Sequence, residues 1–397
     1  MAMETFVKNV DKDLYKEGAA WRGPNGQKTS PVRYFCAKAD AEGIGPDAKV
    51  LDKREKHYLR KFRVPESLEA TPRGEKVKGY ARDSWYVETM FKEMGIPIRG
   101  ADTPTVNECF GGAAKGFSVT SVQAIFPIFY DNAIIAGLLA QPLLDRLVAD
   151  TVQVNSGTAD HVVMNENTFD RSTGEIGEWT RFPEMSISAT NAPITLKKWG
   201  GILKSSDEAV RRARLPIFQR GLERIGRQLA NDLTDFALDV LLLGDGNTGT
   251  ALSGAADIQA TATTGAPTYA DLVSTMLLFK IGYEPTDMLA TKETFVDLLN
   301  MPEFKDPQAG FRFQANGVVP TPLGLNLHRW DSLASSGWAT TKILMWDANI
   351  SLIQYQEGGI TSESDRIVNG QWSEVATSLY TAFAIADRDA RKLGTGW

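Results

Sequence analysis

The longest regular pattern of apolar positions runs from Leu215 to Leu243. Pro216 suits the first turn of a helix, where its missing N–H costs nothing. The segment would span about 43 Å at about 1.5 Å per residue, well beyond the usual helix of about 11–12 residues. Its apolar side chains recur at steps of three to five residues and so share one face: Ile217, Leu222, Ile225, Leu229, Leu233, Phe236 and Val240. The charged side chains fall mainly on other faces: Arg220, Glu223, Arg224, Arg227, Asp232 and Asp235.

The six residues after this helix, from Gly244 to Gly249, match the dinucleotide-binding signature G-x-G-x-x-G. That signature needs a strand before it and a helix that begins at it, because the helix N-terminus holds the pyrophosphate. Here the helix comes first and a loop-like segment follows. We therefore interpret Gly244 and Gly246 as a helix stop. A nucleotide-dependent oxidoreductase remains an alternative, and tight binding of a dinucleotide would support it.

Upstream of the long helix, the pattern predicts an extended approach, a helix over about Asn132–Leu147 and then a strand. Residues Asn155–Asn191 alternate as a hairpin would, with D-R-S-T-G-E-I-G at the tip. This hairpin carries the aromatic residues Phe169, Trp179 and Phe182. A long polar hairpin is marginally stable alone and needs a partner surface. The alternative is a hairpin folded back on its own subunit. A further strand, KKWGGILKSS, follows it.

Downstream of the long helix, short helices and strands alternate. YADLVSTMLLFKIG and TKETFVDLLN are predicted helices, the second with Thr291 as its N-cap. The predicted strands are DMLA, KILMWD, NISLIQYQ and ATSLYTAFAIAD. The last is apolar on both faces, which is typical of a central strand in a sheet. The segments TGTALSGAADIQATATTGAP and FKDPQAGFRFQANGVVPTPLG are expected to be loops. This mixture predicts an α+β fold.

Residues 1–115 differ from the remainder because they are charged, weakly periodic and interrupted by Pro and Gly. KVLDKREKHYLRKF and DSWYVETMFKEMG are predicted helices. We expect this region to pack poorly alone and to act as an arm that docks on neighbours. Lys49–Arg82 holds 11 Lys and Arg against 5 Asp and Glu, so it carries +6 while the rest of the chain sums to −12. A solvated charged face is the ordinary interpretation of such a run.

The bulk composition excludes several classes of protein. The 397 residues are 43% hydrophobic and 23% charged with a net charge of −6, which suits a globular chain with a large core. Cys36 and Cys109 are the only cysteines, which fits a reducing compartment. There is no signal peptide and no run of 18 apolar residues, so we expect a cytoplasmic chain without a membrane segment.

The sequence offers no nameable catalytic or metal site. Its three histidines, His57, His161 and His328, are scattered, and no G-x-S-x-G, Walker A, H-E-x-x-H or EF-hand motif occurs. The acidic pairs Asp207–Glu208 and Glu363–Asp365 are best explained as solvated surface. We therefore expect no enzyme activity, no cofactor and no metal.

The order of these elements resembles the major capsid proteins of tailed bacteriophages with the Hong Kong 97-type fold. The resemblance covers about Gly116 to Leu393. It is carried by TLKKWGGILKSSDEAVRRA leading into LPIFQRGLERIGRQLANDLTDFALDVLLLGDGN, by TPLGLNLHRWD, and by the tail ISLIQYQEGGITSESDRIVNGQWSEVATSLYTAFAIADRDARKL.

The resemblance implies a division of the chain into regions. These are a charged extension or arm (1–115), an N-terminal arm with the first helix (116–154), an extended hairpin loop lying over a neighbour (155–193), a peripheral domain with its spine helix (194–246 and 349–397) and an axial domain (247–348).

The implied function is assembly into hexamers and pentamers of an icosahedral virion shell around double-stranded DNA. Its partners would be copies of itself, scaffolding, portal and decoration proteins, and DNA through non-specific contacts; no membrane is implied, and assembly would occur in the host cytoplasm. The intersubunit residues would be Phe169, Trp179, Arg181 and Phe182. A basic segment would face the DNA through Lys53, Arg54, Lys56, Arg60, Lys61 and Arg63.

Two departures from the family pattern limit what is implied. Some members cross-link neighbours through a lysine in the extended loop, but residues 155–191 contain none. Many members lose an N-terminal scaffolding segment, whereas we expect this chain, which starts at Met1, to keep its own. An encapsulin-type nanocompartment is the alternative within the same fold. The additional N-terminal residues argue against it, and particle size and nucleic-acid content would separate the two.

Overall fold

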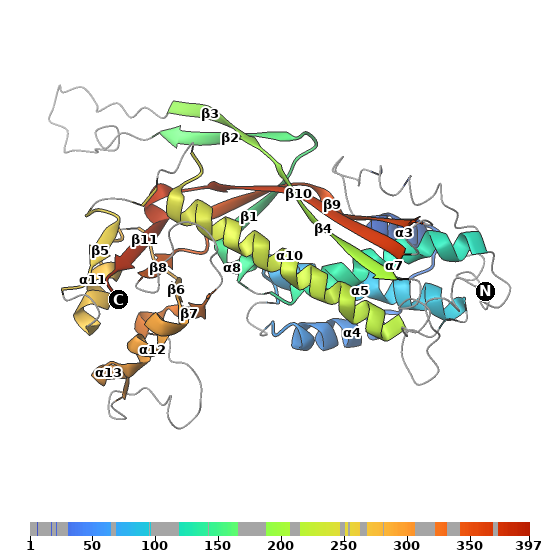
Figure 1. Ribbon diagram of the computed structural model, residues 1–397, viewed down its shortest axis with the longest axis horizontal. Coiled ribbons are helices and arrows are strands. Elements are labelled where there is room, and N and C mark those ends of the chain that lie inside the picture. Colours follow the sequence, from blue (N-terminus) through green and yellow to red (C-terminus); the bar gives the residue numbers. More distant parts are fainter. Residues whose placement is uncertain are drawn as a thin grey trace, which may run out of the picture.

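The structure is a computed structural model in which helices and strands form stacked layers (Figure 1). It describes residues 31–64, 69–94, 119–141, 143–165, 188–206, 215–246, 255–262, 268–280, 282–305, 322–331, 342–367 and 372–397, and the single residues 6, 17, 21, 96, 251 and 252.

One four-stranded sheet forms the layer on which the long helices pack. Its order is β1-β9-β10-β4, with the strands β1 (Val148–Gln153), β9 (Leu352–Ile367), β10 (Trp372–Ile385) and β4 (Lys197–Ser206). β10 is antiparallel to both β9 and β4, and β1 is parallel to β9. The predicted central strand is confirmed in β10, where Ala382, Phe383, Ala384 and Ile385 are all buried. Together with the helices below, this sheet confirms the α+β class.

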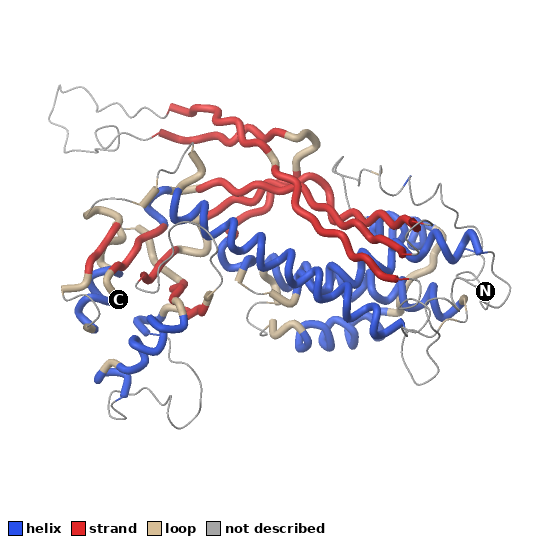
Figure 2. Tube along the Cα trace, in the orientation of Figure 1, coloured by secondary structure: helices blue, strands red, loops and turns tan. Residues whose placement is uncertain are grey.

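A second sheet of five strands lies beyond the C-terminal end of the long helix (Figure 2). Its order is β5-β11-β8-β6-β7, with the strands β5 (Ile258–Ala260), β11 (Arg391–Thr395), β8 (Lys342–Trp346), β6 (Asp287–Ala290) and β7 (Asn326–Arg329). The helices α11 (Tyr269–Met276), α12 (Lys292–Asn300) and α13 (Pro302–Lys305) accompany it. The predicted N-cap is confirmed, since the Thr291 hydroxyl accepts a hydrogen bond from the backbone N–H of Thr294.

One strand of the second sheet corrects a prediction. β5 lies in a segment that we expected to be a loop. Its three residues are too few to give a recognisable pattern. β11, at the C-terminal end of the chain, pairs with β5 and β8. The chain therefore returns from β10 of the first sheet to the second sheet for its last strand.

The long helix α10 (Leu215–Leu243) has the bounds that its apolar pattern predicts. The residues after it are a helix stop, as expected: Gly244 and Gly246 have φ of 90° and 80°, in the left-handed region that favours glycine. Asp245, between them, accepts a hydrogen bond from the backbone N–H of Ile385 at 3.0 Å. The dinucleotide-binding signature needs a strand before it, whereas here the helix α10 precedes it.

A buried arginine closes the same end of α10. Arg391 donates from Nη1 to the carbonyl oxygens of Leu241 and, at 3.3 Å, Val240. A cation at a helix C-terminus is favourable because it meets the negative end of the helix dipole. Burial lowers the pKa of Arg391 to about 10, and the nearby Asp245 and Asp257 offset part of that effect. The guanidinium thus joins the long helix to the second sheet.

A second long helix, α7 (Val119–Leu139), lies beside α10. The prediction of an extended approach before residue 132 is wrong, and the helix passes through Pro127. An internal proline removes one backbone hydrogen bond and normally ends a helix. Here Ile128, Phe129 and Tyr130 are all buried, and their packing outweighs that cost. The predicted helix also divides near its end, where α8 (Leu144–Leu147) forms a separate turn.

The described part of residues 1–115 forms a third layer of helices: α3 (Pro31–Ala41), α4 (Ala48–Lys61) and α5 (Pro72–Glu93). Both predicted helices are confirmed. The described helices of this region pack on the rest of their own subunit, since Phe35, Tyr86 and Phe91 are fully buried in the main core. Docking of the region on neighbours stays a prediction. α5 is weakly periodic, whereas α4 is clearly amphipathic. The neighbouring helix α7 is apolar on most sides and packs against α3 and α5.

The two long helices approach each other at a pair of glycines. A Cβ on Gly226 would lie 2.1 Å from the carbonyl oxygen of Ile134, and one on Gly137 would lie 2.1 Å from that of Glu223. Only glycine fits at either position, because both atoms that a side chain would meet belong to backbone. The backbones of α7 and α10 are therefore in direct contact. Among the described helices, none has the length and apolar character needed to cross a membrane.

We predict that Gly226→Ala destabilises the subunit, because its methyl group must push α7 and α10 apart. The free energy of unfolding, measured in urea on unassembled subunits, should fall by about 1–3 kcal/mol, as overpacked cores do. Gly221→Ala in the same helix is the control, since nothing lies within 4 Å of its Cβ. That change should stabilise the subunit by about 0.5–1 kcal/mol. Similar effects of the two changes would contradict the close contact.

Candidate functional site

The predicted hairpin exists and projects from the molecule on the side of the sheet opposite to α4 (Figure 1). β2 (Thr158–Asn165) and β3 (Ser188–Thr195) pair antiparallel from Thr158↔Thr195 to Asn165↔Ser188. Its root is buried on the first sheet through Ala159, Ile194 and Leu196 of the hairpin and Tyr355, Ala382 and Ala384 of β9 and β10. The root therefore covers the face of β10 that the long helices leave open.

A histidine–tyrosine hydrogen bond fixes this root. His161 on β2 is buried, and its Nδ1 lies 2.8 Å from the hydroxyl oxygen of Tyr355 on β9. Burial raises the pKa of Tyr355, and the charge of Asp150 adds to the effect, so the phenol stays protonated at neutral pH. The sequence contains no signal for this pair, since the two residues are 194 positions apart.

The four residues predicted to make intersubunit contacts fall between β2 and β3 in the sequence. Phe169, Trp179, Arg181 and Phe182 fall outside the described residues. What the structure establishes is the position and direction of the strands that lead to them.

The basic segment gathers into a row on the outer face of α4. Lys49, Lys53, Lys56 and Arg60 are all exposed and recur at steps of four, three and four residues, which places them in an arc of roughly 60°. We call these four residues the α4 stripe. The buried residues Tyr58, Leu59 and Phe62 lie on the opposite side of the helix and pack against α5 and α7. The stripe extends about 16 Å along the helix axis.

The other predicted basic residues have different environments. Arg54 is half-buried and forms an ion pair with Glu88 at 2.8 Å, so its charge is compensated within the subunit. Lys61 is exposed, with Nζ 5.7 Å from the ring centre of Tyr58 and 5.4 Å from that of Phe62. Arg63 is exposed just beyond the helix. Within the stripe, a hydrogen bond to Asp52 raises the pKa of Lys56.

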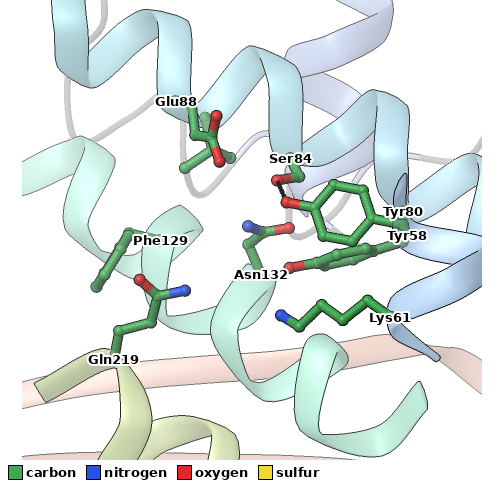
Figure 3. Close-up of a pocket in the computed structure, with 9 residues that line it drawn as sticks. Tyr58, Lys61, Tyr80, Ser84, Glu88, Phe129, Asn132 and Gln219 are labelled. Carbon is green, nitrogen blue, oxygen red and sulfur yellow. Dashed lines mark hydrogen bonds between the residues drawn. The ribbon is translucent and has the colours of Figure 1, made fainter. Parts of the chain in front are cut away.

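A small polar cavity lies where α4 meets α5, α7 and α10 (Figure 3). Tyr58 and Ser84 share a hydrogen bond of 2.9 Å there, and Asn132 of α7 and Gln219 of α10 complete the lining. Burial raises the pKa of Tyr80 well above its usual value. The cavity measures about 20 Å³, which is room for roughly one water molecule. It is thus a packing site that joins four helices.

Two basic residues at the start of α5 join this helix to α4 and α8. Arg73 donates from Nη2 to the carbonyl oxygen of Phe62 at 2.9 Å and so closes the C-terminal end of α4. Lys76 pairs with Asp145 of α8 at 3.0 Å. The α4 stripe is therefore carried on a helix that is fixed at its end and along its buried face.

Three other titratable groups, His328, Asp287 and Cys36, are held in contacts within the subunit. His328 of β7 has Nε2 2.6 Å from the carboxylate of the fully buried Asp287, which also accepts a hydrogen bond from the Thr286 hydroxyl. Cys36 is a buried free thiol whose pKa burial raises well above normal, which makes it unreactive. Within the described ranges, no group of three or more His, Cys, Asp or Glu could hold a metal ion.

Comparison with known proteins gives one family match. A family model described as phage capsid protein matches residues 190–392, more than half of the 397-residue chain. A search of curated protein sequences finds no relative.

Solved structures with a similar fold include capsids and one encapsulin. The capsid of the Cyanophage P-SCSP1u aligns with TM-score 0.47 and 15% identity over 63% of this chain and 86% of its own. The capsid of a native GTA particle gives 0.46 and 15% over 63% and 88%. The holo-SrpI encapsulin from Synechococcus elongatus PCC 7942 gives 0.42 and 13% over 64% and 86%.

We predict that Tyr355→Phe loosens the root of the hairpin. The change leaves the buried His161 without its hydrogen-bond partner, which typically costs about 1–3 kcal/mol. Hydrogen exchange of the amides in β2 and β3 should become faster, while that of β10 should stay unchanged. Tyr380→Phe is the matched control, because Tyr380 is an exposed tyrosine of the same sheet. Equal exchange in both variants would show that the hydroxyl does not hold the root.

Proposed function

The chain belongs to the phage capsid protein family and is a structural shell protein, and on that premise we propose that it forms hexamers and pentamers of an icosahedral shell around double-stranded DNA. Assembly would take place in the host cytoplasm, with scaffolding, portal and decoration proteins as further partners. No catalytic step is needed, because the function rests on surfaces that bind copies of the same chain.

The observation that carries this proposal is the projecting hairpin. Two paired strands project from the body of the subunit, and their root is buried on it through Ala159, Ile194 and Leu196. A two-stranded hairpin is at best marginally stable in water and gains stability from a surface beyond its own strands. The adjacent copy in a shell supplies such a surface, and Phe169, Trp179, Arg181 and Phe182 are the residues that we expect to contact it.

The α4 stripe is the basis for the proposed DNA contact. Four exposed cations lie on one face of a helix that is otherwise fixed by burial. Contacts between cations and phosphates need no base recognition, and they release counterions from the duplex. The hairpin strands and α4, the helix that carries the stripe, lie on opposite sides of the subunit (Figure 1). We therefore assign the α4 side to the interior of the shell and the hairpin side to the lattice of neighbouring copies.

The aromatic residues of the hairpin give a first test. Trp179→Ala with Phe182→Ala should reduce the yield of shells in electron micrographs, because large buried aromatics dominate subunit contacts. Thermal unfolding of the unassembled subunit should change little. If the same change lowers the melting temperature as much as it lowers assembly, the hairpin belongs to the core of its own subunit and the proposed contact is wrong.

The α4 stripe gives a second test, the binding of duplex DNA by unassembled capsomers at several salt concentrations. K53Q/K56Q/R60Q removes three proposed phosphate contacts, so the slope of log affinity against log salt should become shallower by about 2.7. The control K198Q/K292Q/R329Q, called the distant triple here, removes the same charge from exposed positions on β4, α12 and β7. An equal loss in both variants would mean that overall charge, and not the stripe, binds DNA.

A further inference from the structure

A second row of basic side chains lies on the exposed side of α10. Arg220, Arg224 and Arg227 are spaced by four and three residues, so they share an arc of roughly 60°. All three are exposed, and no ion pair joins any of them to an acid within the parts of the chain that the structure describes. The acid between them, Glu223, is half-buried and accepts a hydrogen bond from Gln219 at 3.2 Å. We call these three arginines the α10 row.

The core does not need the α10 row. The buried side of this half of α10 consists of Leu222, Gly226 and Leu229, which face the interior. Surface cations that only keep a helix soluble are commonly paired with acids three or four residues away. The α10 row holds three arginines on one side without such pairs, and this excess of charge is what requires an explanation.

The two helices that carry the α4 stripe and the α10 row meet at the small cavity. Lys61 of α4 and Gln219 of α10 line the same small cavity (Figure 3). Arg60 precedes the first of these residues and Arg220 follows the second. The C-terminal end of the α4 stripe and the N-terminal end of the α10 row are thus on neighbouring helices.

We propose that the α10 row is a second contact to the phosphate backbone of the enclosed duplex, continuing the α4 stripe onto the long helix. The inference rests on the proposed function, since it needs DNA on this side of the shell. Arginine suits this role because its planar guanidinium binds two phosphate oxygens at once. The contact reads no sequence, because it involves only the backbone.

Ile217 provides a way to test the competing explanation. It lies about 20° beyond the edge of the arc of the arginines and is 61% exposed. An apolar side chain makes no hydrogen bond or ion pair with a phosphate, whereas an interface between two copies would bury it. Ile217→Ser should therefore leave both DNA affinity and shell formation unchanged.

The decisive experiment measures binding of a short mixed-sequence duplex to unassembled capsomers of the full chain. R220Q/R224Q/R227Q keeps residues that favour a helix and should make the salt slope shallower by about 2.7. The distant triple should change the salt slope by less than about 0.9, which is the value for one phosphate contact. Thermal unfolding should show that all variants remain folded.

The outcomes separate the two proposals. If R220Q/R224Q/R227Q binds DNA as the distant triple does, the inference is overturned, whether or not the α4 variant loses affinity. If only the α4 variant loses affinity, the proposed function stands without the α10 row. If the arginine variant and Ile217→Ser both stop shell formation while DNA affinity is unchanged, this side of α10 is an interface between copies and the inference is likewise overturned.

Discussion

The direct backbone contact between α7 and α10 is the constraint on which the rest of the subunit depends. Gly137 and Gly226 let the two helices lie closer than any side chain would allow. One side of this pair then packs on the first sheet, where Phe236 lies 5.2 Å from Trp199 and 5.6 Å from Phe383 between ring centres. The N-terminal helices pack on another side through α7. A wider separation of α7 and α10 would loosen their packing on the first sheet and on the N-terminal helices at the same time.

This layering places chemically different surfaces on opposite sides of one subunit. The side beyond the sheet carries the hairpin, whose root buries small and aromatic side chains. The side beyond α7 carries the basic residues of α4. A net charge of −6 for the whole chain hides this separation, because acids elsewhere outweigh the basic helix. The fold therefore allows a protein that is acidic overall to present a row of cations on one face of α4.

The sequence predicted those elements whose pattern is long enough to be read locally. The bounds of α10, the central position of β10 and the Thr291 cap follow from periodicity and local hydrogen bonding. Where tertiary packing decides the outcome, the prediction was wrong: α7 continues through Pro127. The contact between His161 and Tyr355 joins residues that only the finished fold brings together. For the basic surface, the charge of the segment could be read from its residues, but the buried face of α4 decides which cations form the exposed stripe and which, like Arg54, pair within the subunit.

The junction between the hairpin and the sheet has a mechanical consequence. Leu196 alone separates β3 from β4, and all ten residues of β4 pair with β10. Hydrogen bonds between antiparallel strands run perpendicular to the strands. A pull on the hairpin along the chain therefore loads the whole ladder in shear, where the bonds share the force, and does not open them one at a time as peeling would. Tension that neighbouring subunits exert on β3 would pass through Leu196 into the paired strands β4 and β10.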